Sequence, residues 1–156
     1  MHDFFYNNNI MQLSEEEISR RVARAAELHG QGFNCSQSVF AACADLYGID
    51  CDTALRLAAS FGGGIGQMRQ TCGAACGMFM LAGLENGSSI PDKPQAKRIN
   101  YQLVQHLAEG FRQHNGSLIC GDLLGLNGTQ PPVQKRPCKD MVTDAVRQYL
   151  EAVSSN

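Results

Sequence analysis

Apolar residues recur at intervals of three and four along the stretch from Cys138 to Val153, and this spacing constrains the fold more than any other feature. The residues concerned are Met141, Val142, Ala145, Val146, Tyr149, Leu150 and Val153. In a helix they share one face, which must be buried against other helices. No stretch of comparable length alternates apolar and polar residues with period two, as a half-buried strand does. The sequence therefore predicts an all-α protein.

Cap and turn residues divide the rest of the chain into further helices. Ser14 and Asn34 fit N-cap positions, and Gly30 and Gly48 fit helix ends. The expected helices cover about residues 15–30, 35–47, 52–61, 72–86, 95–115 and 138–153, with a brief helical turn after Cys120. A chain of 156 residues is by default one domain. We expect a compact single-domain bundle of five or six main helices over residues 13–156, preceded by a flexible N-terminal arm, residues 1–12.

Charge and hydropathy exclude several classes of function. The formal net charge is -2 and the Lys and Arg residues are scattered, so the basic patch of a nucleic-acid binder is missing. The N-terminus has neither a positive segment nor an apolar one, and no apolar run approaches the ~20 residues of a membrane span. We expect a cytoplasmic protein without a membrane span. A symmetric homodimer is the usual state of a small soluble protein.

The chain has seven cysteines, which the cytoplasm would keep mostly as thiols, so redox or metal chemistry is a better interpretation than a disulfide framework. Four of them fall in the first turn of an expected helix: Cys35, Cys72, Cys120 and Cys138. Unpaired N–H groups and the helix dipole favour the thiolate there and lower the pKa of the thiol. Arg69 precedes Cys72 and would add to the effect.

The remaining cysteines and the histidines carry weaker signals. Cys43 lies in the middle of an apolar helix face and is expected to be a packing residue. Cys51 stands before a helix without flanking cations, and Cys76 lies one helical turn after Cys72, where a disulfide between the two would be strained. We expect His29, at a helix end, to have a structural role.

Glycines dominate the stretch "FGGGIGQMRQTCGAACG", residues 61–77. Without side chains they allow a ligand or another thiolate to approach, and their N–H groups can converge on an anion. We expect Gly62, Gly63, Gly64 and Gly66, together with Gly73, to line the site over Cys72 and to contact any bound cofactor. A phosphate cradle is the competing interpretation, but neither G-x-x-x-x-G-K-[ST] nor a G-x-G-x-x-G after a strand is present.

Together these residues resemble the redox-active family named for its cysteine pattern, C_GCAxxG_C_C. The core motif CGAxxG stands here as residues 72–77. The segments "GFNCSQSV" and "FGGGIG" stand before this motif and "CGDLLG" and "RPCKDMV" after it, which is the order expected of the family. The resemblance implies a redox role for Cys35, Cys72, Cys120 and Cys138, and a redox partner protein or a transporter-associated system as the partner. It assigns no role to Cys43, Cys51 or Cys76.

Two functional hypotheses follow. In the first, the protein performs dithiol/disulfide chemistry without a cofactor, with Cys72 as nucleophile and Cys35, Cys120 or Cys138 as resolving thiol. In the second, the same four thiolates hold a metal ion or an iron–sulfur cluster, although the spacing of known metal motifs is absent. Both require the four helix starts to meet in one pocket, with the glycine run along its wall. If the cysteines only pack, no such convergence is needed.

Overall fold

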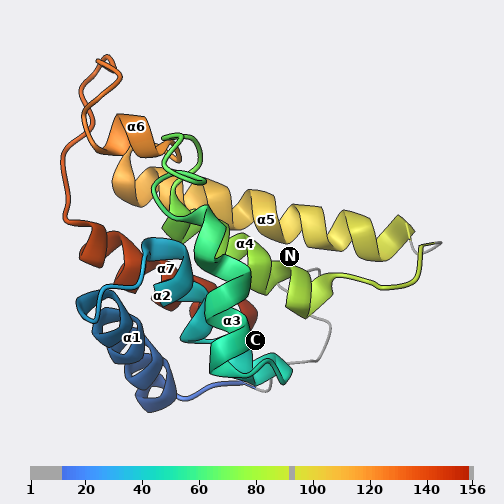
Figure 1. Ribbon diagram of the computed structural model, residues 1–156. Coiled ribbons are helices and arrows are strands. Elements are labelled where there is room, and N and C mark those ends of the chain that lie inside the picture. The colour runs from blue at the N-terminus through green and yellow to red at the C-terminus, as the bar shows by residue number, and fades with distance from the viewer. Residues whose placement is uncertain (1–11, 92–93, 155–156) are drawn as a thin grey trace.

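The computed structural model describes residues 12–91 and 94–154, and their secondary structure is helical (Figure 1). Its elements are α1 (Glu15–Gly30), α2 (Cys35–Ala41), η2 (Ala44–Tyr47), α3 (Cys51–Ala58), η3 (Ala59–Phe61), α4 (Gly73–Asn86), α5 (Pro94–Asn115), α6 (Cys120–Leu123) and α7 (Cys138–Ser154). The predicted all-α fold is confirmed. Most of the expected N-terminal arm lies outside the described residues.

Two expected helices are each divided into an α-helix and a short 3₁₀ turn. The segment 35–47 becomes α2 and η2, and 52–61 becomes α3 and η3. Asn34 caps α2 as expected: its side chain accepts from the Gln37 amide at 2.9 Å, and the Gln37 side chain accepts from the Asn34 amide at 3.0 Å. This reciprocal capping box fixes the start of α2, which is where Cys35 lies.

Helix α4 is the central element of the bundle, with α2, α5 and α7 packed against it. Ten of its 14 residues are buried. Gly77 faces α2, where a Cβ would lie 2.8 Å from the Cβ of Val39. Since real Cβ atoms do not approach so closely, glycine at this position lets α2 and α4 pack with little space between their backbones.

The C-terminal helix packs in the manner that its periodicity predicts. Every apolar residue of the stripe from Met141 to Val153 is buried, and α7 lies against α1, α2, α4 and α5. Helix α5, the long helix drawn in gold in Figure 1, buries Leu103, Leu107 and Phe111 against the same core. Burial of each such side chain contributes about 1.5–3 kcal/mol, so these stripes hold the bundle together.

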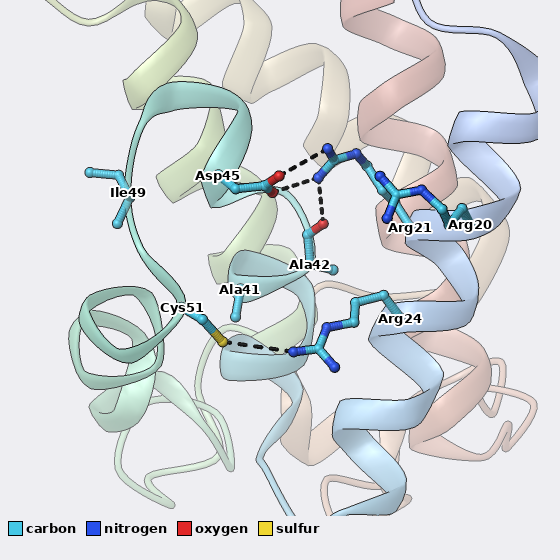
Figure 2. A pocket seen from close by; sticks show the side chains of 8 residues that line it. All are labelled: Arg20, Arg21, Arg24, Ala41, Ala42, Asp45, Ile49 and Cys51. Atoms are coloured by element: carbon cyan, nitrogen blue, oxygen red, sulfur yellow. Dashed lines mark hydrogen bonds and ion pairs between the residues drawn. The ribbon is translucent and has the colours of Figure 1, made fainter.

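A buried arginine ties α1 to the end of α2. Arg21 is 6% exposed, and its guanidinium donates to the Asp45 carboxylate at 2.6 and 3.0 Å and to the Ala42 carbonyl at 3.0 Å. Figure 2 shows these bonds at the wall of a shallow pocket between α1 and η2. The bond to the Ala42 carbonyl satisfies an acceptor where α2 ends, and Asp45 balances the buried charge.

None of the helices within residues 12–91 and 94–154 combines the length and the apolar character needed to cross a membrane.

Candidate functional site

Four helix starts meet at one cavity of about 190 Å³, and each brings a cysteine. Cys35, Cys120 and Cys138 are the first residues of α2, α6 and α7, and Cys72 is the N-cap of α4. The polar and glycine residues of the wall are His29, Asn34, Gly63, Gly64, Arg69 and Gly73. Leu123, Leu124 and Met141 complete it. The convergence that both functional hypotheses require is therefore present.

Two short extended segments join the starts of α4 and α6. The Cys72 amide donates to the Leu118 carbonyl at 2.7 Å, and the Cys120 amide donates to the Gln70 carbonyl at 2.6 Å, on either side of an antiparallel bridge between Thr71 and Ile119. These bonds fix Cys72 and Cys120 relative to each other, although 48 positions separate them in the chain (120 − 72). In Figure 1 the green loop before α4 accordingly lies beside α6.

The glycine run forms a left-handed turn. Residues 63–67 all have φ between 57° and 72°, and Arg69 follows with a φ of 60°. Each non-glycine residue in this conformation costs roughly 1–2 kcal/mol, so Ile65, Gln67 and Arg69 are strained. Bonds from the Arg69 amide to the Gly63 carbonyl and from the Gln70 amide to the Gly64 carbonyl, at 3.2 and 2.9 Å, hold the turn closed.

Not every glycine expected at the site reaches it. Gly63, Gly64 and Gly73 line the pocket, and a Cβ on Gly64 would lie 2.5 Å from the Cβ of Cys120. Gly62 and Gly66 do not line it: Gly62 is buried against the Asn34 side chain, and the left-handed turn carries Gly66 out to the surface. The glycine run thus brings its backbone close to Cys120. The sequence interpretation had instead placed the run over Cys72.

The thiols of Cys35 and Cys138 form a coupled pair. Their hydrogen bond is the largest cause that lowers the pKa of Cys138 to about 6, and the positive charge of Arg69 acts in the same direction against partial burial. The same bond, together with burial and the charges of the other thiolates, raises the pKa of Cys35. Cys138 therefore holds the thiolate of this pair near neutral pH, and Cys35 holds the proton. Both side chains are partly exposed.

The other two thiols of the pocket are more deeply buried. Burial raises the pKa of Cys72 to about 11, although the amides of Ala74 and Ala75 at the helix start act against it. The expected low pKa at Cys72 is thus replaced by a raised one, because desolvation outweighs the helix start. The Arg69 guanidinium donates a hydrogen bond to the Cys120 sulfur at 3.7 Å, and burial, not Arg69, is the largest influence on the pKa of Cys72.

The three further cysteines lie outside this pocket. Cys43 is fully buried in the core, as expected, and burial raises its pKa to about 12. Cys76 is 7% exposed, and its thiol lies 3.8 Å from the Thr71 carbonyl. Cys51 is exposed and lies in the pocket between α1 and η2, which we call the second pocket. The Arg24 guanidinium lies 3.8 Å from its sulfur (Figure 2). All seven cysteines are free thiols.

Metal binding by the four cysteines was the second hypothesis. Among the described residues, no group of three or more His, Cys, Asp or Glu side chains is arranged to hold a metal ion. The four cysteines thus share a pocket without forming a ready tetrahedral set. His29 was expected to be structural, yet it lines the pocket. Its sequence position at the end of α1 gave no signal of this, because the residues that it faces belong to other helices.

A family model described as "Putative redox-active protein (C_GCAxxG_C_C)" matches residues 33–152. The chain belongs to this family. The matched range includes all four helix starts that meet at the pocket. An uncharacterized protein of Archaeoglobus fulgidus is 30% identical to the chain over 145 residues, which cover 88% of this chain and 96% of the archaeal protein. No solved structure matches the chain.

Proposed function

We propose that this protein is a thiol–disulfide redox protein in which Cys138 is the attacking thiolate and Cys35 is the resolving thiol. The observation that carries the proposal is the coupled pair at the starts of α7 and α2, in which Cys138 has a pKa of about 6. A thiol with this pKa is about nine-tenths thiolate at pH 7, and the thiolate is the form that attacks disulfides. Cys35 and Cys138 are both partly exposed residues, which supports access by a substrate.

The proposed reaction has two steps. The Cys138 thiolate attacks one sulfur of a substrate disulfide, whose S–S bond breaks, and the leaving thiolate takes a proton from water. Cys35 then loses its proton to solvent and attacks the Cys138 sulfur, which forms a Cys35–Cys138 disulfide and releases the second substrate thiolate. The substrate gains two electrons and the protein loses two. A protein dithiol is the partner we propose for re-reduction, in a cytoplasm that keeps the pair reduced.

Cys72 and Cys120 have a different part in this proposal. Their deeper burial and the raised pKa of Cys72 disfavour both as the first attacking group. The hydrogen-bonded segments 69–72 and 118–121 hold them beside the reactive pair. We therefore assign neither of them to the two exchange steps, and we propose Cys138 as the nucleophile in place of Cys72, which the sequence interpretation had chosen.

The experiment is a single turnover of the fully reduced protein with one equivalent of 2-hydroxyethyl disulfide, followed by mapping of the disulfides by mass spectrometry. The expected product is the Cys35–Cys138 disulfide. Cys138→Ser should abolish its formation, whereas the matched control Cys51→Ser, at an exposed cysteine of the second pocket, should leave its rate unchanged. A Cys138→Ser protein that still consumes the disulfide at the original rate would overturn the assignment.

A parallel measurement addresses the metal hypothesis. Protein purified without oxygen is analysed for metal content and for visible absorbance, in wild type and in Cys72→Ser. Stoichiometric metal in the wild type that is lost in the variant would mean that the cysteines are ligands and would contradict the dithiol proposal. A metal-free, colourless protein that remains folded and oxidises at Cys35 and Cys138 is the result we expect.

A further inference from the structure

Arg69 places a guanidinium in the wall of the cysteine pocket, and no carboxylate of that wall pairs with it. Apart from the thiols, the ionisable side chains of the wall are Arg69 and His29, and the wall has no Asp or Glu. Within the described ranges no carboxylate lies at ion-pair distance from Arg69. Arg136, two residues before Cys138, differs in this respect because it pairs with Asp144 at 2.6 Å. The Arg69 guanidinium has five N–H groups, and within the described part of the chain its hydrogen bond goes to the Cys120 sulfur. Donors therefore remain for an anion.

Arg69 is held in the pocket wall by its backbone. Its amide donates to the Gly63 carbonyl at 3.2 Å, and its carbonyl accepts from the Gly121 amide at 3.1 Å. These bonds keep the residue at a φ of 60°, a conformation that costs free energy outside a supporting structure. An arginine held in this way is a preorganised recognition group, because its backbone is already fixed before a ligand arrives.

The size of the pocket limits what can enter. At about 190 Å³ it is smaller than the roughly 300–1,000 Å³ of sites for drug-sized ligands. A substrate that lies wholly inside this volume is a small molecule, whereas a redox partner protein could reach only the partly exposed edge of the Cys35–Cys138 pair. A carboxylate matches a guanidinium well, because the two can form parallel charge-assisted hydrogen bonds, and it is small enough to be part of a ligand of this size.

We propose that the substrate of this site is a small disulfide that carries a carboxylate, which Arg69 binds while the disulfide lies against Cys138. The proposal rests on the dithiol function and specifies its substrate class. The chemistry is the exchange described above: the Cys138 sulfur bonds to one substrate sulfur, one carboxylate-bearing thiolate leaves and is protonated by water, and Cys35 releases the second. The two thiols of Cys35 and Cys138 together supply both electrons.

Three disulfides of similar length and different charge test this. Reduced protein reacts in single turnover with 3,3′-dithiodipropionate (anionic), 2-hydroxyethyl disulfide (neutral) or cystamine (cationic) at low salt. Each rate of Cys35–Cys138 disulfide formation is divided by the rate of the same reagent with free 2-mercaptoethanol, which removes differences between the leaving thiols. We expect the anionic reagent to exceed the neutral one by about tenfold, the scale of one charge-assisted hydrogen bond.

Variants of Arg69 separate recognition from thiolate stabilisation. Arg69→Gln should bring the anionic-to-neutral ratio close to one. Near pH 5.5 it should also slow all three reagents, because Cys138 loses a nearby positive charge and a smaller fraction of it is thiolate. Arg69→Lys should keep most of the ratio, and Arg69→Glu should invert it. Arg24→Gln, in the second pocket, is the matched control and should leave the ratio unchanged. Circular dichroism checks that each variant is folded.

The two possible failures are distinct. A wild-type ratio near one, or a ratio that survives in Arg69→Gln, would overturn the proposal of an anionic substrate while the neutral reagent still oxidised the pair. If none of the three reagents produced a Cys35–Cys138 disulfide, the dithiol function itself would be wrong.

Discussion

Replacing Cys35 with alanine tests the interaction on which the proposed function depends. The hydrogen bond with Cys35 is the largest cause that lowers the pKa of Cys138 to about 6, and alanine has no donor to replace it. We expect the pKa of Cys138 in Cys35→Ala to rise toward the ordinary value of about 8.5. Arg69 stays in place in this variant, so a full return to the ordinary value is the largest change expected.

The expected change in rate depends on pH. Near pH 5.5, a rise in pKa from about 6 to about 8.5 reduces the thiolate fraction from about one quarter to about one thousandth, or about 240-fold. A thiolate of higher pKa is also the better nucleophile, by about 13-fold over this interval, so the rate with a disulfide should fall by about 20-fold. Near pH 7 the two effects nearly cancel and leave a change of about twofold. The assay must therefore be run in mild acid.

The measurement follows the loss of the free Cys138 thiol in 2-hydroxyethyl disulfide, with a maleimide quench and mass spectrometry of the peptide that contains it. Exposed Cys51 in the same samples is the internal control and should react at equal rates in both proteins. Cys35→Ser keeps a hydroxyl donor and should react at an intermediate rate. If Cys138 in folded Cys35→Ala reacts within twofold of the wild-type rate near pH 5.5, the coupling between the two thiols is refuted.

Three further predictions concern stability, measured by chemical denaturation. Gly64→Ala should destabilise the fold by about 2 kcal/mol or more, because Gly64 has a φ of 72° and a new Cβ there would lie 2.5 Å from the Cβ of Cys120. Its control, Gly83→Ala, has open space around the new Cβ and should be neutral or stabilising by up to about 1 kcal/mol. Asp45→Asn should cost about 1 kcal/mol near neutral pH. Since the hydrogen bond from its arginine partner lowers the pKa of Asp45, that loss should vanish as acid protonates the wild-type carboxyl below about pH 4. Asn34→Ala should cost about 1–2 kcal/mol through the lost capping box.

The helices could be predicted from the sequence because their signals are local. The stripe of α7 and the cap at Asn34 need only residues within a few positions of one another, and both are confirmed. The end of α2 at Ala41 was not predicted, because one stabilising contact there comes from another helix: Arg21 of α1 donates to the Ala42 carbonyl. A buried arginine on an otherwise apolar helix face has no periodic signature.

The site divides in the same way. The positions of the four cysteines at helix starts are local and were predicted, and their convergence followed from the hypothesis that they act together. The order of their pKa values could not be predicted, since it depends on the folded bundle: Cys72 is buried in the core, and Cys35 bonds to Cys138 from another helix. The interpretation of Cys72 as nucleophile counted its helix start and omitted desolvation.

The meeting of the α2 and α7 starts also couples the redox state of the protein to its folding stability. A disulfide between Cys35 and Cys138 would close a loop of about 100 residues, which in the chain-entropy account disfavours the unfolded chain by roughly 4 to 5 kcal/mol. The same free energy acts in reverse, because folding brings together two thiols that are far apart in the unfolded chain and so makes their oxidation easier. Oxidation of Cys35 and Cys138 would thus raise the free energy of unfolding of the protein. Each reduction would lower it again and leave a protein that is more readily unfolded and degraded.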